Sequence, residues 1–308
     1  MCLVQPQPTQ QNEQATKSPR HFKPILSQNN PRYTDLRLPN SDLFASHSLS
    51  QRLERAEGMA NAAYIESRAK LALTATPEWI DVSGTYAMFD TPDSPVTQTF
   101  GLGMFGEATA ADLDRIEAFF ASHSAPVHHE ISPLADPSVW PLIAERRYAP
   151  FEFTSILYMD LRNAQIPEPA NPNGIQVRVS PPEEAETWAR TAVAGWGQSP
   201  VIEDFMQTVF NTEGVSPFMA EKDGHPIATG ALNIQNGVAL LAGASTIPVA
   251  REQGAQRALL AARLHYAVEA GCEIAAMGAL PGSASQRNAE RSGFRIAYTR
   301  TKWRLAVQ

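Results

Sequence analysis

The residues best suited to bind a ligand lie in a short turn between an apolar run and a long helical segment. The turn contains Arg251 and, three residues later, Gly254. Glycine lets the backbone approach a ligand without an intervening Cβ. A helix N-terminus presents free N–H groups and the positive end of the helix dipole to an anion. The spacing therefore predicts a site for a phosphate or pyrophosphate group.

Three elements must position this turn. The run Val238–Thr246 is apolar and has the length of a strand, and Cys272–Met277 predicts a second buried strand. Between them, helix formers fill Arg257–Ala270, and Gly271 stands where a helix-ending glycine belongs. The order of strand, turn, helix and strand is typical of an α/β domain.

The segment from Thr246 to Leu260 resembles the coenzyme A signature of the GNAT N-acetyltransferase family. That signature has Arg or Gln, two free positions, Gly, one free position, and then Gly or Ala. Arg251 and Gly254 match it, whereas Gln256 departs from the last small position. The later Arg291-Ser-Gly-Phe294 and the strand predicted at Ile296–Leu305 fit the closing helix and strand of the family. The resemblance covers residues 175–308.

The resemblance implies that acetyl-coenzyme A, or free coenzyme A, binds as a co-substrate. The strand around Ser245 would hydrogen-bond the pantetheine arm, and the turn backbone would hold the pyrophosphate. The expected coenzyme contacts are Ala244, Ser245, Thr246, Arg251, Glu252, Gln253, Gly254, Ala255 and Gln256, with Ser283 and Asn288 as further hydrogen-bonding candidates. The implied reaction is acetyl transfer to a primary amine of a small molecule or peptide.

The catalytic residues are less clear than the coenzyme turn. Many family members carry a Tyr four residues before the Gly of the Gly-Phe pair, and this position is Ala289 here. Tyr298 is a candidate substitute, and the alternative is a core aromatic on an alternating strand. Trp188 and Trp196 are two helical turns apart, so they form either one wall of an acceptor site or part of a core. The general acid and the general base stay unassigned.

The two halves of the chain repeat each other weakly at a constant offset of 145. Ala144-Glu145-Arg146 recurs as Ala289-Glu290-Arg291, and Phe153-Thr154 corresponds to Tyr298-Thr299, since 289 − 144 = 145 and 299 − 154 = 145. The same shift carries the helix predicted at 110–122 onto 255–267. The repeat predicts two copies of one α/β unit in tandem. Together with the resemblance of the second half, it implies an α/β fold with a mixed sheet, built from two tandem GNAT-like domains.

The composition of successive segments suggests the domain boundaries. A polar, disordered tail is expected at 1–40, a degenerate GNAT-like domain at 41–165, a Pro/Asn/Gly-rich linker at 166–174 and the coenzyme-binding catalytic domain at 175–308. In the first domain the glycine-rich segment 100–110 corresponds to the phosphate turn. Acidic residues there would repel a pyrophosphate, so we expect no coenzyme site in the first domain.

Charge and cysteine content narrow the class of protein. A net charge of −7 argues against a general nucleic-acid or membrane partner. Two cysteines, Cys2 and Cys272, make no disulfide framework and favour a cytoplasmic location. No metal site is expected, because His128 and His129 would point to opposite faces of a strand. Two alternatives remain, a non-catalytic acyl-coenzyme A sensor or interaction module and a scaffold without ligand, and the oligomeric state is open.

Overall fold

The computed structural model describes residues 45–71, 76–162, 164–166, 173–197 and 200–305. The tail predicted at 1–40 and most of the predicted linker lie outside these ranges. None of the helices within the described ranges is long and apolar enough to cross a membrane.

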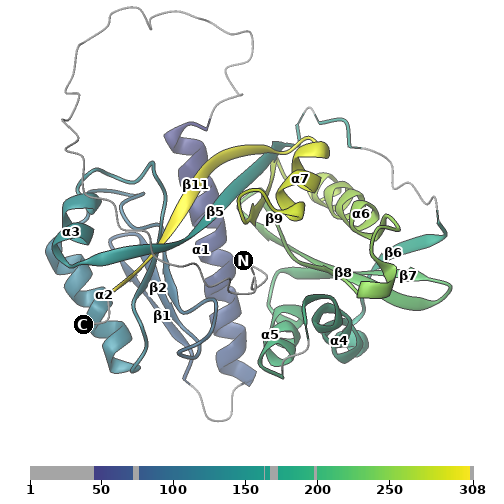
Figure 1. The fold of residues 1–308 in the computed structure, drawn as a ribbon, viewed down its shortest axis with the longest axis horizontal. Helices are drawn as coiled ribbons and strands as arrows, with labels where there is room; N and C mark the ends of the chain where they lie inside the picture. The colour runs from purple at the N-terminus through teal and green to yellow at the C-terminus, as the bar shows by residue number, and fades with distance from the viewer. Residues whose placement is uncertain (1–44, 72–75, 163, 167–172, 198–199, 306–308) are drawn as a thin grey trace, which may run out of the picture. The chain divides into compact units, whose positions relative to one another are not determined.

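Both halves of the described chain combine helices and strands (Figure 1). The first half contains α1 (His47–Leu71), β1 (Glu78–Val82), β2 (Thr85–Phe89), β3 (Gln98–Phe100), α2 (Ala110–Ser122), β4 (His128–Ile131), α3 (Val139–Glu145) and β5 (Tyr148–Asp160). The second half contains β6 (Ile175–Val179), α4 (Ala185–Trp196), α5 (Pro200–Asn211), β7 (Val215–Lys222), β8 (His225–Gln235), β9 (Val238–Thr246), α6 (Ala255–Glu269), β10 (Ile274–Ala279), α7 (Ala284–Arg291) and β11 (Arg295–Leu305). The strand–turn–helix–strand order predicted around Gly254 is confirmed.

The described strands form one 11-stranded sheet in the order β1-β2-β3-β4-β11-β5-β10-β9-β8-β7-β6. β3 pairs with β4 in parallel, and so does β9 with β10, while the other neighbours are antiparallel. The mixed α/β sheet predicted from the sequence is therefore confirmed. The strands of both halves share it without a break.

The last strands of the two halves, β5 and β11, have exchanged places. β5 closes the first half in sequence but lies between β10 and β11, and β11 closes the second half but pairs with β4. β5 and β11 also pair with each other from Tyr148 and Leu305 to Tyr158 and Arg295. Each half thus completes its part of the sheet with a strand of the other.

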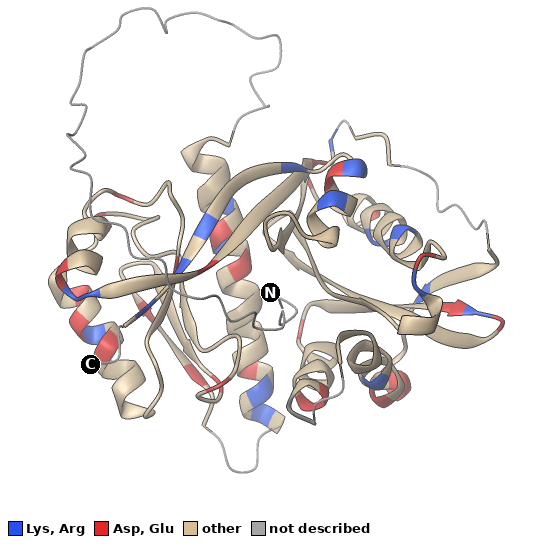
Figure 2. Ribbon diagram, in the orientation of Figure 1, with Lys and Arg blue, Asp and Glu red and all other residues tan. Residues whose placement is uncertain are grey.

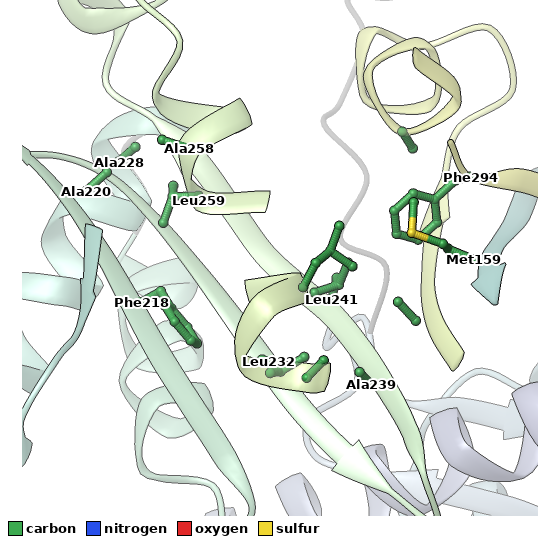
Figure 3. Close-up of a cluster of buried hydrophobic side chains, with 14 of the residues drawn as sticks. Met159, Phe218, Ala220, Ala228, Leu232, Ala239, Leu241, Ala258, Leu259 and Phe294 are labelled. Atoms are coloured by element: carbon green, nitrogen blue, oxygen red, sulfur yellow. The ribbon is translucent and has the colours of Figure 1, made fainter. Parts of the chain in front are cut away.

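Helices cover both faces of the sheet. One face packs against α6 and α7 through a core that includes Leu241, Leu259 and Phe294 (Figure 3). The alternate residues of the same strands face α1, α4 and α5, because successive side chains of a strand point to opposite faces. A third core, around Leu113, Ile116 and Phe120, joins α2 to the first-half strands.

Helix α1 is held to the sheet by buried charges as well as by apolar packing. Arg300 on β11 is 1% exposed, and its Nη2 lies 2.7 Å from Glu57 of α1 and 2.9 Å from Glu130 of β4. The Tyr298 hydroxyl donates a 2.7 Å hydrogen bond to Glu54, one turn before Glu57. Figure 2 shows acidic residues on α1 near basic residues of β11. Charges this deeply buried are stable only when paired, so they fix the position of the helix.

The internal offset of 145 residues coincides with the observed elements. Shifted by 145, α2 falls on residues 255–267 of α6, and α3 falls on residues 284–290, within α7. The helices predicted at 110–122 and 255–267 are confirmed. The interpretation of the halves as two copies of one domain, with the division at 166–174, stays a prediction.

The strand exchange makes the second half dependent on the first. We expect a fragment of residues 175–308 to lack a cooperative fold, because β10 and β11 would both lose β5, the strand between them. Circular dichroism and NMR dispersion, measured beside the full chain, would check this. A well-dispersed spectrum from the isolated fragment would contradict the assignment of β5 as a shared strand.

Candidate functional site

The centre of the second half opens where two parallel strands part. β9 and β10 pair at three positions, from Val238 with Ile274 to Leu240 with Ala276. Beyond them β9 continues to Thr246 alongside β8, and β10 continues to Ala279 alongside β5. The facing edges of β9 and β10 are therefore released from each other at their carboxyl ends, where an extended ligand can pair with backbone groups.

A bulge in β9 lies within this opening. Between two paired positions, Gly230 of β8 stands opposite both Gly243 and Ala244 of β9. Gly243 has a φ of +61°, a conformation that glycine adopts without strain. Ala244 is exposed whereas its neighbours are buried. The bulge thus turns a short stretch of backbone out of the regular ladder.

The turn after β9 leaves the start of α6 open. Gly254 is the N-cap residue of α6 with a φ of +96°, and no side chain caps this helix end. A Cβ built on Gly254 would meet no atom within 4 Å. The first turn of a helix has N–H groups without intrahelical partners, so this open, uncapped end suits an anion. No acidic residue stands in the first turn of α6 to compete for it.

Helix α4 closes one side of the opening. Gly195 lies so near β9 that an added Cβ would be 2.7 Å from the Ser245 hydroxyl. Trp196 donates a 3.0 Å hydrogen bond from its Nε1 to the carbonyl of Ala244. Arg251 reaches back from the turn and donates from Nη2 to the carbonyl of Gly195 at 2.9 Å. The end of α4, the end of β9 and the turn are thereby tied together.

A buried arginine supports the bulge from the α6 side. Arg263 is 3% exposed, and its Nη1 donates to the carbonyls of Ala231 and Ala242 at 3.2 and 3.3 Å. Gly230 leaves room for it, since an added Cβ would be 2.8 Å from the guanidinium carbon. Burial lowers the pKa of Arg263 to about 10. The sequence analysis missed this residue, although an arginine on the apolar face of a helix was a visible signal.

Comparison with known proteins agrees with this geometry. Residues 183–294 match the model of the Acetyltransferase (GNAT) family. The second half contains a GNAT-family domain. No curated protein matches the sequence.

Solved structures with the same fold extend over both halves. A GCN5-related N-acetyltransferase from Kribbella flavida is 20% identical, with a TM-score of 0.58 over 80% of this chain and 96% of that one. A tandem GNAT protein from the clavulanic acid biosynthesis pathway is 13% identical, with a TM-score of 0.53 over 86% and 98% of the two chains. A GCN5-related N-acetyltransferase from Sphaerobacter thermophilus is 18% identical, with a TM-score of 0.50 over 67% and 71%. At these identities the likeness shows the GNAT fold.

Most of the predicted coenzyme contacts come together in this GNAT domain. The run from Ala244 to Thr246 and the turn from Arg251 to Gln256 border the opening. Gln253 is held by Lys222, whose Nζ donates to its Oε1 at 2.8 Å. Ser283 caps α7 by accepting from the N–H of Gln286, and Asn288 is exposed on the same helix. Whether these residues contact a coenzyme stays a prediction.

The two predicted tryptophans have different environments. Trp188 has no exposed surface, packs edge-on against Phe210 and donates from Nε1 to the carbonyl of Phe218 at 2.9 Å. Trp188 thus packs in the core, and its role as an acceptor wall stays a prediction. Trp196 is partly exposed at the mouth of the opening, so a role there is retained for it.

Tyr298 lies in a core on β11, outside the opening between β9 and β10, and its catalytic role stays a prediction. It is 6% exposed, packs against α1 with Leu53 and Ala56, and donates its hydroxyl to Glu54. Burial raises its pKa well above the ordinary value. β11 is separated from β9 by β5 and β10. Sequence periodicity marked the residue as core but gave no sign of Glu54, its distant partner.

The corresponding helix end in the first half is closed. Thr109 and Asp112 form a capping box, in which each side chain accepts from the backbone of the other. A Cβ on Gly103, in the glycine-rich loop before it, would be 2.3 Å from Val139. No cluster of three or more His, Cys, Asp or Glu suited to a metal occurs in the described ranges.

Glu54 gives a prediction for pH dependence. Burial raises the pKa of Glu54 from 4.5 to about 6. The stabilisation that protonated Glu54 gives the folded state is therefore fully present below pH 4.5 and is lost as the pH rises through 6. Relative to Glu54→Gln, which keeps an acceptor for Tyr298, the wild-type protein should lose about 2 kcal/mol of unfolding free energy between pH 4.5 and 7.5. Urea denaturation across this range measures the difference, and parallel profiles would refute it.

Proposed function

We propose that this protein is an N-acetyltransferase that moves an acetyl group from acetyl-coenzyme A to a primary amine. The observation that carries the proposal is the uncapped, glycine-opened start of α6, directly after the strand that has parted from β10. One end of this arrangement suits a pyrophosphate and the other suits an extended amide-bearing arm. The GNAT match over residues 183–294 supports the same assignment.

The backbone of the turn from Arg251 to Gln256 would bind the pyrophosphate through its N–H groups. Arg251 and the exposed Arg257 add positive charge to this end of α6. The edge of β9 from Ala244 to Thr246 would hold the pantetheine arm. The thioester would then lie beside the bulge, between the parted strands.

In the proposed reaction the amine nitrogen attacks the thioester carbonyl carbon. Backbone N–H groups at the bulge would stabilise the negative charge that develops on the carbonyl oxygen. Arg263 would hold this backbone in place through its bonds to Ala231 and Ala242. The carbon–sulfur bond breaks, an amide forms, and coenzyme A leaves as the thiol after taking up a proton.

The acceptor class is an amine on a small molecule or a peptide. Trp196, at the mouth of the opening, would border the amine as it approaches. The group that takes up the ammonium proton stays unassigned.

The first half would serve as a structural partner without a coenzyme site. Its helix end is already occupied by Asp112, and its glycine loop is filled by Val139. Its contribution to the proposed enzyme is β5, which completes the sheet beside β10.

A second candidate function is a non-catalytic acyl-coenzyme A sensor. It is favoured by Ala289, which stands where many GNAT enzymes carry a Tyr, and by the burial of Tyr298 against Glu54. Both functions require coenzyme binding, but only the enzyme releases free thiol from acetyl-coenzyme A when amines are added. A thiol-release assay over a panel of amines separates them.

Gly254→Asp tests the coenzyme site. The carboxylate would stand at the uncapped start of α6 and repel the pyrophosphate, so we expect at least a tenfold loss of acetyl-coenzyme A affinity, about 1.4 kcal/mol. Isothermal titration calorimetry measures it. The matched control is Gly271→Asp, at the other end of α6, where the glycine also has a positive φ and open space around it. Equal effects of the two substitutions would refute the site.

A further inference from the structure

The parted end of β9 is bound by side chains along its whole length. Five successive carbonyl groups, from Ala242 to Thr246, each accept a hydrogen bond from a side chain. The donors, in order, are Arg263, Thr229, Trp196, Gln256 and Arg251. Successive carbonyls of a strand point to opposite edges, so these five do not all face the edge released from β10, and the carbonyl of Ser245 lies in the ladder with Thr229 of β8.

Gln256 is the one of these donors that crosses from the coenzyme turn to the strand edge. It is the second residue of α6, and its Nε2 donates to the carbonyl of Ser245 and to the hydroxyl of Thr246, both at 2.8 Å. Its carboxamide thus stands between the proposed pyrophosphate site and the proposed pantetheine edge. It is also the position at which the sequence departs from the small residue of the coenzyme A signature.

We propose that Gln256 is a built-in occupant of the coenzyme path, which coenzyme A must displace in order to bind. This inference rests on the proposed function. The carboxamide of Gln256 has the same hydrogen-bonding groups as the amides of a pantetheine arm, and it bridges the coenzyme turn and the end of β9, where such an arm would lie. The chain therefore carries an internal competitor for its own ligand.

The other donors to this edge are less easily displaced. Trp196 packs against the core shared by α4 and α5, and Arg263 is buried. Arg251 bonds two separate carbonyls, those of Gly195 and Thr246. Gln256 is only partly buried, so its side chain can leave β9 by rotation about its own bonds while the backbone of α6 stays in place.

Gln256 lowers the affinity for coenzyme A because only molecules in which its side chain has left β9 can bind the coenzyme. The apparent dissociation constant equals the intrinsic one divided by the fraction of molecules whose path is open. Two hydrogen bonds of ordinary strength keep that fraction on the order of one in ten. Removing the carboxamide should therefore tighten binding about tenfold, the opposite of what deletion of a ligand contact does.

The test compares Gln256→Ala and Gln256→Met with the wild-type chain, by calorimetric titration with coenzyme A. Alanine removes both the donor and the bulk, and methionine keeps the length without the donor. Gln176→Ala, at an exposed glutamine of β6, is the matched control. We expect about tenfold tighter binding for Gln256→Ala, a smaller gain for Gln256→Met, and no change for Gln176→Ala.

Stability and NMR provide readouts that do not need coenzyme binding. The free Gln256→Ala protein should melt at a lower temperature than the wild type, because two hydrogen bonds are lost. The side-chain amide signals of Gln256, assigned by their absence in the variant, should show slowed solvent exchange in the free protein.

Each outcome decides between named interpretations. Weaker binding by Gln256→Ala would make Gln256 a coenzyme contact and overturn the proposal, as would unchanged affinity or rapid exchange of its amide. Tighter binding by the variant, including binding by the variant alone, would support both the occupant and the site. If neither the wild type nor any variant binds coenzyme A, the proposed function is refuted, and with it the competition between Gln256 and the coenzyme. Slowed exchange of the Gln256 amide would in that case still confirm its contact with β9.

Discussion

β5 and β11 pair along nearly their full length at the middle of the sheet, and each is the neighbour of the other half's central strand. This pairing joins the two halves into one sheet and places Arg300 of β11 under α1, where Glu57 and Glu130 surround it. A buried arginine with fewer carboxylates would be strongly unfavourable, so the positions of α1, β4 and β11 are mutually dependent. The exchanged strands thus keep the sheet continuous although β9 and β10 separate at their carboxyl ends.

The parting of β9 from β10 has a cost that the surrounding side chains offset. Backbone acceptors at the parted end of β9 need partners, and they find them in side chains of α4, α6, β8 and the turn itself. These partners hold an open edge ready for an extended ligand, but they also compete with it. Affinity at such an edge depends on which partner leaves most easily, and the short, rotatable Gln256 differs here from Trp196 and Arg263.

The contrast between the halves lies in two helix ends of similar position. At α2, Asp112 and Thr109 use the backbone donors of the first turn, and Val139 fills the space beside Gly103. At α6, neither a cap nor a neighbouring side chain takes that place beside Gly254. A carboxylate of the chain itself thus caps α2, whereas the start of α6 is left without a side-chain cap.

The sequence by itself determined the local elements and the glycine-containing turn before α6. Gly254, the apolar run before it and the helix formers after it act over a few residues, so their pattern predicts their structure without knowledge of distant partners. Only the tertiary structure decided which strands lie side by side, because the pairing of β5 with β10 joins residues more than a hundred positions apart. The same distance hid the partner of Tyr298, the burial of Trp188 and the contact of Gln256 with β9, since each depends on which element the fold brings opposite rather than on the residue's own neighbours in the chain.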